Sequence, residues 1–254
     1  MQKMELKEFN IAYSRDGDGT PLVLIHGYPL DHSIWDPVVP LLTSTFDVIA
    51  PDLRGFGESG STRGTYGMPE LAADLAEMLD GLRIEQAVLA GHSMGGYVAL
   101  AFAKAFPARV RGLGLVSSQV LADPPDRKEG RYKSAADVAE KGVAVVADAM
   151  APKLTADPRL QGLARDLIMK QSPDGVMGAL KAMAEREDAT ELIRGFQLPV
   201  VLVHGDADAL IPIDRAREVE AAVLQARMFA LEGVGHLPMM EAPRQTGDAL
   251  RYLA

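Results

Sequence analysis

The chain has 254 residues, of which 48% are hydrophobic, and its formal net charge is −9. This length and apolar content are enough for one large core in a single α/β domain. The charge is spread along the sequence and leaves no basic block, so we expect no binding to nucleic acid or to an anionic membrane surface. Cysteine is absent, which excludes disulfides, thiolate metal sites and a cysteine nucleophile.

The beginning of the chain gives no targeting signal. Residues 1–8 carry charges throughout, and no apolar run in the sequence approaches the length of a membrane span. We therefore expect neither a signal peptide nor a transmembrane segment. The prediction is a cytoplasmic protein that does not associate with membranes.

Strand and helix patterns alternate over most of the chain. Short apolar or alternating runs predict strands at 6–13, 21–26, 46–50, 86–90, 110–117, 198–204 and 226–231. Helical spacing of apolar residues predicts helices at 33–42, 69–82, 97–106 and 215–223, and a short one from about residue 244. This alternation favours an α/β fold with a mostly parallel sheet and helices on both of its faces.

The pattern changes between residues 118 and 196. No strand-like run occurs there, and Ala, Met and Leu recur at helical spacing over 135–150, 160–169 and 175–184, with prolines at breaks such as Pro152, Pro158 and Pro173. We predict a helical cap over 118–196, inserted into a core formed by 1–117 and 197–254. Ligands of such sheets bind beyond the carboxyl ends of the strands, where the cap would lie.

A serine stands between the strand predicted at 86–90 and the helical pattern that follows. Residues 91–95 read GHSMG, the Gly-x-Ser-x-Gly turn that presents a nucleophilic serine from a strained backbone position. Gly91 and Gly95 lack the Cβ atoms that would collide where strand and helix cross, and the helix points its positive end at the serine. We predict Ser93 as a nucleophile. The alternative is an ordinary glycine-rich turn.

A second glycine-rich stretch, GFGESG at 55–60, has the letters of a dinucleotide-binding fingerprint. That fingerprint requires glycines that open a helix directly and an acidic residue at the end of the next strand. Here the helix begins only near Met68 or Pro69, and the acids at the relevant distance, Asp74 and Glu77, lie on that helix. We therefore predict no nucleotide cofactor.

A serine nucleophile needs a base whose pKa lies near the working pH, and histidine fills this role best. His236 lies in a glycine-rich loop after the last predicted strand, and we predict it as the base. His92 adjoins the serine but is expected to face elsewhere on the turn. His26 and His204 end buried strands, and His32 lies in a loop without an evident partner.

The base must in turn be held in one tautomer by a buried carboxylate. The segment 205–212, GDADALIP, offers Asp206 and Asp208. We choose Asp208 because it lies deeper in the loop, whereas Asp206 directly follows a strand and is expected to bond the local backbone. Asp123, after the strand at 110–117, is a more distant alternative.

The oxyanion formed by attack on a carbonyl needs backbone donors, and the loss of one donor typically lowers the rate about 100- to 1000-fold. Two amides are available: that of Met94, next to the nucleophile at the start of the helix, and that of Tyr28, after His26 and Gly27.

The chain resembles the α/β-hydrolase superfamily, and within it the bacterial carboxylesterases, enol-lactonases and cofactor-free haloperoxidases. The matching stretches are 26–29 (HGYP), 52–59 (DLRGFGES), 91–96, 205–212 and 235–236. The order Ser, Asp, His is the one expected of that superfamily. The resemblance implies oxyanion roles for Tyr28 and Met94 and a structural role for 52–59. A serine at position 93 argues against haloalkane dehalogenases and epoxide hydrolases, which carry aspartate there.

Together these residues predict hydrolysis of small carboxylic esters with short to medium acyl chains through an acyl-enzyme, without a metal or an organic cofactor. Alternatives on the same triad are a lactonase and a cofactor-free haloperoxidase or perhydrolase, and an alternative of another class is a slow-turnover ligand receptor. The predicted substrate-binding residues are Tyr28, Met150, Met169, Met177, Met183, Leu237 and Met239. Methionines suit an adaptable apolar pocket, although plain core packing would explain them too.

Overall fold

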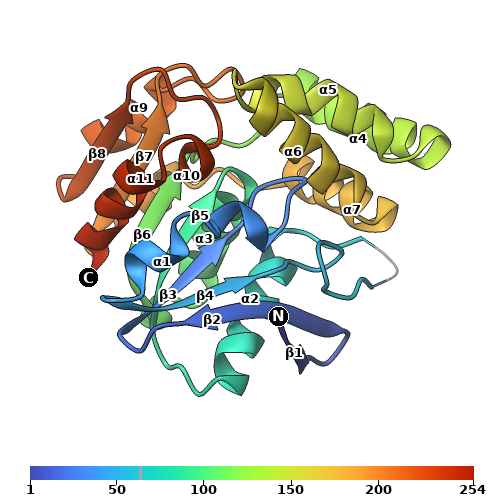
Figure 1. Cartoon of the computed structure of the whole chain (residues 1–254). Coiled ribbons are helices and arrows are strands. Elements are labelled where there is room, and N and C mark those ends of the chain that lie inside the picture. Colours follow the sequence, from blue (N-terminus) through green and yellow to red (C-terminus); the bar gives the residue numbers. More distant parts are fainter. Residues whose placement is uncertain (63–64) are drawn as a thin grey trace.

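Eight strands form a single sheet in the computed structural model, which describes residues 1–62 and 65–254 (Figure 1). Their order is β1-β2-β4-β3-β5-β6-β7-β8. The β1/β2 and β2/β4 pairs are antiparallel, and all the other neighbouring pairs are parallel. The strands are β1 Gln2–Glu5, β2 Asn10–Asp16, β3 Thr20–Ile25, β4 Phe46–Pro51, β5 Ala87–His92, β6 Val110–Val116, β7 Val200–Gly205 and β8 Ala226–Leu231. The predicted fold class is confirmed.

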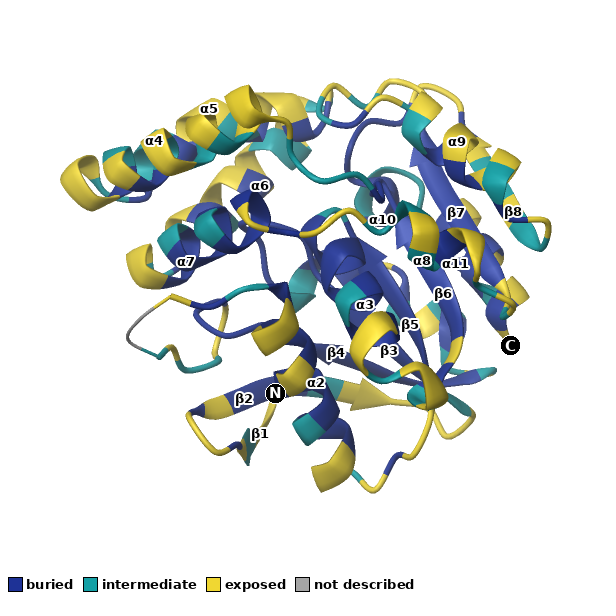
Figure 2. Ribbon diagram, turned by 180° about the vertical axis from the view of Figure 1, so that it is seen from behind, coloured by how far each residue is buried: buried dark blue, intermediate teal, exposed yellow. Residues whose placement is uncertain are grey.

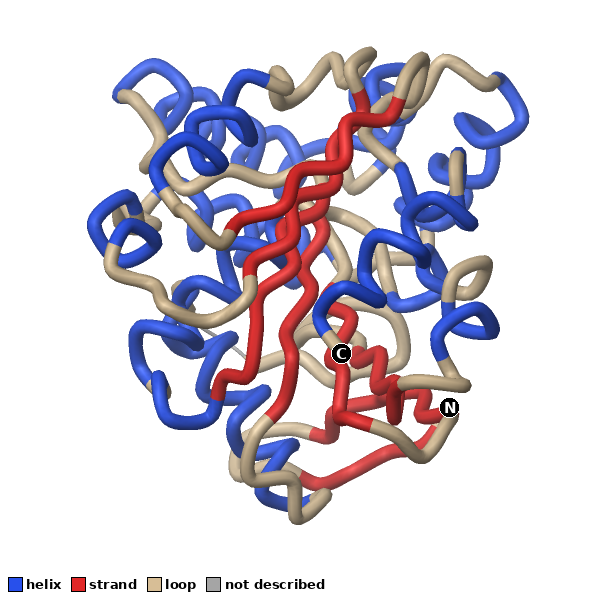
Figure 3. Tube along the Cα trace, turned by 90° about the vertical axis from the view of Figure 1, so that its left-hand side faces the viewer, coloured by secondary structure: helices blue, strands red, loops and turns tan. Residues whose placement is uncertain are grey.

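Helices cover both faces of this twisted sheet (Figure 3). They are α1 Val39–Leu42, α2 Met68–Gly81, α3 Met94–Ala105, α4 Pro125–Lys141, α5 Ala144–Leu154, α6 Pro158–Met169, α7 Pro173–Ala184, α8 Thr190–Arg194, α9 Asp214–Ala222, α10 Pro238–Glu241 and α11 Pro243–Leu250, with 3-10 turns at His32–Trp35, Pro107–Arg109 and Arg251–Leu253. On one face α2 packs against α3, and on the other α1 packs against α11. Among the described residues, no helix combines the length and the apolar character needed to cross a bilayer.

Most residues of the strands in the middle of the sheet lie in the interior (Figure 2). Every residue of β4, β5 and β7 is buried. Parallel strands with helices on both faces have no solvent side, which is why their sequences are continuous apolar runs instead of alternating ones.

Three predicted elements differ from the structure. Of the run at 6–13, residues 6–9 form the turn between β1 and β2, closed by a hydrogen bond from Leu6 N–H to Phe9 O (2.8 Å), and only residues 10–13 lie in a strand, β2. The helix predicted at 33–42 is divided into a 3-10 turn and α1. Gly142, with φ of 80°, separates α4 from α5 within the predicted helix 135–150. Pro152, predicted at a break, lies inside α5.

Helices α4 to α8 occupy the segment between β6 and β7. The predicted cap, 118–196, contains all of them; within it α4 packs against α7 and α5 against α6 (Figure 1). The cap sits on the loop at 52–59, where a Cβ added to Gly55 would lie 2.5 Å from the Gly175 Cα. Gly57 N–H also donates to the Gln171 side chain, at 2.8 Å. The fingerprint-like loop is therefore the place where the cap meets the core.

A buried ion pair fixes the same loop to α2. The Arg54 guanidinium donates two hydrogen bonds to the Asp74 carboxylate, at 2.7 and 2.6 Å, and its side chain is only 6% exposed. Removal of one partner from such a pair leaves an uncompensated charge in the interior, which costs more than the pair itself contributes.

We expect Arg54→Met to lower the free energy of unfolding by about 3–5 kcal/mol, because Asp74 would stay buried without its cation. Urea denaturation at pH 7 measures the loss. Lys141→Met is the control, since it removes an exposed pair with Asp137 and should cost less than about 1 kcal/mol. Equal losses in the two variants would contradict a structural role for this loop.

Three strands lead into buried histidines: His26 directly follows β3, His92 ends β5, and His204 lies in β7. His26 is fully satisfied, because its Nε2 accepts a hydrogen bond from Leu53 N–H (3.0 Å) and its Nδ1–H donates to Gly27 O (3.0 Å). Burial lowers the pKa of His26, and burial likewise holds the pKa of His92 well below its ordinary value. Both imidazoles are therefore neutral in the folded chain.

We expect the free energy of unfolding to fall as the pH falls below about 6.5, the ordinary pKa of histidine. Below this pH the unfolded chain binds protons at His26 and His92, whereas the folded chain keeps both rings neutral. Each histidine therefore contributes up to about 1.4 kcal/mol per pH unit to the slope of the free energy of unfolding against pH. His32 acts oppositely: burial opposes its protonation, but the hydrogen bond to Asp52 prevails and raises its pKa. The stabilisation that His32 contributes to the folded chain is therefore present at low pH and lost as the pH rises.

Urea denaturation of the wild type and of His32→Gln at pH 5.5, 6.5 and 7.5 checks this expectation. The variant lacks the opposing contribution, so its stability should fall more steeply toward pH 5.5. A stability that stays flat or rises toward pH 5.5 in the variant would show that the buried histidines are not neutral.

Candidate active site

The predicted nucleophile lies at the sharp turn from β5 into α3. Ser93 has φ of 50° and ψ of −111°, a conformation that a non-glycine residue adopts only under constraint from its surroundings. Ser93 N–H donates to Val116 O at 2.9 Å, which ties the turn to the end of β6. Ser93 itself is partly exposed, while the residues on either side are buried.

Three glycines allow the turn to pass this close to its neighbours. A Cβ on Gly91 would lie 2.2 Å from the Gly95 backbone, and one on Gly95 would lie 2.3 Å from Ile25 O in β3. A Cβ on Gly96 would lie 2.2 Å from Ser118 Oγ, which donates to Ser93 O at 2.8 Å. Ser118 therefore braces the turn from the strand end of β6, a contact that the sequence did not suggest.

The predicted base and acid are in direct contact. His236 Nδ1 lies 2.7 Å from Asp208 Oδ2, and both side chains are almost completely buried. Because an ionised carboxylate can only accept, Nδ1 carries the proton and Nε2 keeps its lone pair. Burial would raise the pKa of Asp208, but hydrogen bonds from His204 and His236 outweigh it and hold the pKa well below its ordinary value. Asp208 is therefore ionised.

His92 connects the base to the turn that carries the nucleophile. Its Nε2 donates to the His236 carbonyl at 2.8 Å, and the two rings lie 4.9 Å apart between centroids. The other edge of the His92 ring lies against Gly27, where a Cβ would come within 2.3 Å of Nδ1. The residue before Ser93 thus contacts His236, although the sequence suggested that it faces elsewhere. In the described part of the chain, Ser93 Oγ makes no hydrogen bond to His236.

The loop that carries His236 is fixed on both sides. The Glu241 carboxylate accepts hydrogen bonds from Gly235 N–H (3.1 Å) and Leu237 N–H (3.0 Å), the residues that flank His236. His236 N–H donates to Leu154 O at the end of α5, at 2.8 Å. Glu241 is not among the residues predicted from the sequence; the signal for it is its position four residues after Leu237, within reach of that amide across one helical turn.

The two predicted oxyanion donors lie at the ends of neighbouring strands. Tyr28 follows β3 and Met94 begins α3, directly after β5. Neither backbone N–H has an acceptor among the residues that the structure describes. The Tyr28 ring is buried, which raises the pKa of its hydroxyl, and that hydroxyl has no partner within the same part of the chain. Two backbone amides at neighbouring strand ends are therefore without an acceptor in the described part of the chain.

The other acidic and histidine candidates have structural contacts. Asp206 accepts a hydrogen bond from Gly233 N–H (2.7 Å), a backbone role as expected but with a distant residue. Asp123 forms buried ion pairs with Arg131 and with Arg186, the latter at 2.8 Å. The expectation that His32 lacks a partner is wrong, because its Nδ1 lies 2.7 Å from Asp52 Oδ1.

One group of described residues could be considered for a metal ion. Ligand-type atoms of Asp31, His32 and Asp52 lie within 4.8 Å of one another. All three already have protein partners, however: Asp31 accepts from the Gln171 amide at 3.0 Å and from Ser33, and Asp52 accepts from His32. We assign no metal to this group.

The predicted substrate-binding residues fall into three sets. Met150 on α5 and Met177 on α7 are half-buried in the cap, and Met183 is buried there, with its Sδ 3.3 Å from Arg131 Nη1. Met169 is 44% exposed at the end of α6, so we no longer assign it to the substrate pocket. Leu237 and Met239 are completely inaccessible and pack in the core behind His236, which corrects their assignment to the pocket wall.

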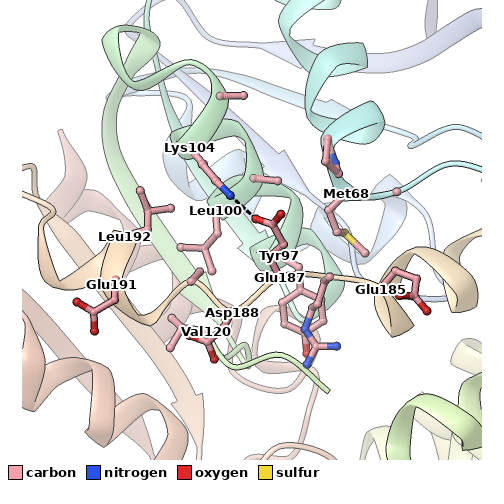
Figure 4. Close-up of a pocket in the computed structure, with 16 residues that line it drawn as sticks. Met68, Tyr97, Leu100, Lys104, Val120, Glu185, Glu187, Asp188, Glu191 and Leu192 are labelled. Atoms are coloured by element: carbon pink, nitrogen blue, oxygen red, sulfur yellow. Dashed lines mark hydrogen bonds and ion pairs between the residues drawn. The ribbon is translucent and has the colours of Figure 1, made fainter. Parts of the chain in front are cut away.

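A cavity of about 630 Å³ lies beside α3, and Ser93, Asp208 and His236 do not line it (Figure 4). Its apolar wall includes Met68, Tyr97, Leu100, Val120 and Leu192, and the Lys104–Glu187 ion pair lies at its edge. Tyr97 stands one helical turn after Ser93, so the cavity lies along the outer side of the helix that the nucleophile begins.

Comparison with known proteins agrees with this arrangement. An esterase from Thermogutta terrifontis, in a malate-bound structure, is 34% identical and superimposes with a TM-score of 0.96 over 99% of this chain and 97% of its own. A pimeloyl-[acyl-carrier protein] methyl ester esterase from Aeromonas hydrophila subsp. hydrophila is 28% identical, over 96% of this chain and 98% of its own.

The dihydrolipoyllysine-residue acetyltransferase component of the acetoin cleaving system of Pseudomonas putida is 34% identical over 91% of this chain. The match spans only 62% of that protein's length. A family model described as the alpha/beta hydrolase fold matches residues 20–243, which include the strands from β3 to β8 and the predicted triad. The chain belongs to the alpha/beta hydrolase fold family.

Proposed function

We propose that the protein is a serine hydrolase that cleaves small carboxylic esters with short to medium acyl chains, using Ser93, His236 and Asp208. The observation that carries the proposal is the 2.7 Å hydrogen bond between His236 Nδ1 and Asp208 Oδ2. It lies at a histidine whose backbone is tied to His92, the residue before the nucleophile. The similarity to the Thermogutta terrifontis esterase supports the same assignment.

The proposed reaction has two halves. Ser93 Oγ attacks the ester carbonyl while His236 Nε2 takes the hydroxyl proton, and the N–H groups of Tyr28 and Met94 stabilise the oxyanion. The carbon–oxygen bond to the alcohol then breaks as His236 returns the proton to the leaving oxygen, and an acyl-enzyme remains. Water, activated by His236, attacks this ester and releases the acid. Asp208 stays ionised throughout and steadies the imidazolium.

The absence of a direct bond from Ser93 Oγ to His236 is compatible with this mechanism. Catalytic hydrogen bonds are often long or poorly aligned without substrate and shorten in the Michaelis complex. The backbones of Ser93 and His236 are meanwhile held in place by Val116 and His92 respectively.

The cap methionines are proposed to contact the acyl or alcohol group. Met150 and Met177 are half-buried and retain surface for a ligand, and flexible thioether side chains adapt to substrates of different shape. The Tyr28 hydroxyl, buried without a partner in the described part of the chain, is proposed as a polar group for the same ligand.

Ser93→Ala should lower kcat for p-nitrophenyl acetate and butyrate by about 10⁴- to 10⁶-fold, because the nucleophile is lost while the oxyanion donors remain. Circular dichroism and the melting temperature should stay close to those of the wild type. Ser61→Ala, at an exposed serine, is the control and should keep full activity. Turnover that survives in Ser93→Ala would overturn the proposed mechanism.

Asp208→Asn should lower kcat by about 10⁴-fold, since an amide no longer holds His236 in the required tautomer. Asp206→Asn is the matched control two residues earlier, because an amide oxygen can still accept the bond from Gly233 N–H. Steady-state kinetics on the same ester compares the two variants. The reverse ranking would identify Asp206 as the acid of the triad.

A substrate panel separates the reactions that this triad could perform. Aryl esters of two to ten acyl carbons, simple lactones, and bromination in the presence of hydrogen peroxide are compared at equal enzyme concentration. We expect the highest kcat/KM for the shorter esters, with many turnovers per active site. A single turnover followed by arrest would point to a ligand receptor instead.

A further inference from the structure

A second histidine contacts the proposed catalytic carboxylate. His204, in β7, is completely buried, and its Nε2 lies 3.3 Å from Asp208 Oδ2 and 2.8 Å from Ile211 O. A carboxylate and a carbonyl can only accept, so Nε2 carries the proton and shares it between them. His204 Nδ1 is buried without a partner in the described part of the chain, as suits a lone pair better than an N–H.

Asp208 consequently receives three hydrogen bonds and one further close N–H contact. Oδ2 accepts a hydrogen bond from His236 Nδ1 at 2.7 Å, and His204 Nε2 lies 3.3 Å from the same oxygen. Oδ1 accepts from Leu210 N–H at 2.8 Å and from Ile211 N–H at 3.0 Å. A carboxylate offers about four lone-pair sites, and here three accept a hydrogen bond. Rotation of this side chain would break both bonds at Oδ1 and the bond from His236 at Oδ2.

The oxygen that faces the base is therefore shared. Any donor that polarises Oδ2 reduces the negative charge available to stabilise a protonated His236. We propose that His204 is a positioning residue that locks Asp208 and reduces the negative charge that this carboxylate presents to His236. The inference rests on the proposed function, because it needs His236 to act as the base.

The other charged and titratable groups around His236 give no comparable effect on Oδ2. His92 donates to the His236 carbonyl and is neutral. The Glu241 carboxylate already accepts two backbone amides and the Thr155 hydroxyl. None of these contacts touches Asp208. A change at His204 also removes the bond to Ile211 O, so the His204 variants are compared with one another and not only with the wild type.

The test is the pH profile of kcat/KM on p-nitrophenyl butyrate between pH 5 and 9. His204→Leu removes the donor, and we expect the acidic limb of its profile to move about 0.5–1 pH unit toward higher pH, with little change in KM. His204→Gln can place an N–H near the position of the imidazole Nε2 and should restore the wild-type limb. His204→Asn is too short to reach and should behave like His204→Leu.

A purely structural role would lower the melting temperature of His204→Leu and leave the limb where it is, which would overturn the inference. The same holds if His204→Gln shifts as far as His204→Leu. A measurement on the wild type covers the case in which the variants do not fold: ¹⁵N NMR should find the His204 proton on Nε2, and a proton on Nδ1 alone would refute the sharing.

Failure of this inference is distinguishable from failure of the proposed function. If Ser93→Ala retains turnover, the serine mechanism itself is wrong. If Ser93→Ala is inactive and the limb of folded His204→Leu does not move, only the role of His204 is wrong.

Discussion

The fold depends on the close passage of β5 into α3 at Ser93. The positive φ of this serine costs about 1–3 kcal/mol, and the turn persists because its neighbours leave no other path. β3 lies directly behind Gly95, and Ser118 lies against Gly96. A side chain at either position would push the turn away from the sheet. The constraint is thus one of space, and it places Ser93 at the same spot whatever the cap contains.

Buried imidazoles connect the segments that carry the proposed nucleophile, base and acid. His92 links the turn to the loop of His236, and His204 links β7 to Asp208. Each uses one N–H toward a backbone carbonyl or carboxylate, so the rings are held in single tautomers. An imidazole is well suited to this task because it is large enough to pack like an apolar group and still offers a directed donor.

The features that the sequence predicted are those with a local signature. The Gly-x-Ser-x-Gly turn, the continuous apolar strands and the acidic loop after β7 each follow from the spacing of a few neighbouring residues. The rejection of a dinucleotide site at 55–60 also followed from local order, since no helix opens there. The contact between the cap and that loop could not be predicted from local order, because the partner of Gly55 is Gly175, more than a hundred residues away.

The same limit explains the errors. Helical spacing cannot tell which side of a cap helix faces the core, so Met169 was predicted inward although it is exposed. The roles of His92, Glu241 and Ser118 depend on contacts between distant segments, and no pattern within one segment encodes them. The break between α4 and α5 rests on the positive φ of Gly142, a single residue inside an otherwise uninterrupted helical pattern.

The hydrogen bond from His236 N–H to Leu154 O joins the proposed base to the last turn of α5. A cap that swung away as a rigid body would break this bond and free the backbone of the very residue that must accept the serine proton. Opening of the whole cap and readiness of the proposed base are therefore mechanically coupled. If substrate enters by side-chain movement beneath a stationary cap, the backbone of His236 stays in place. If it enters by opening of the whole cap, that backbone is released until the cap closes again.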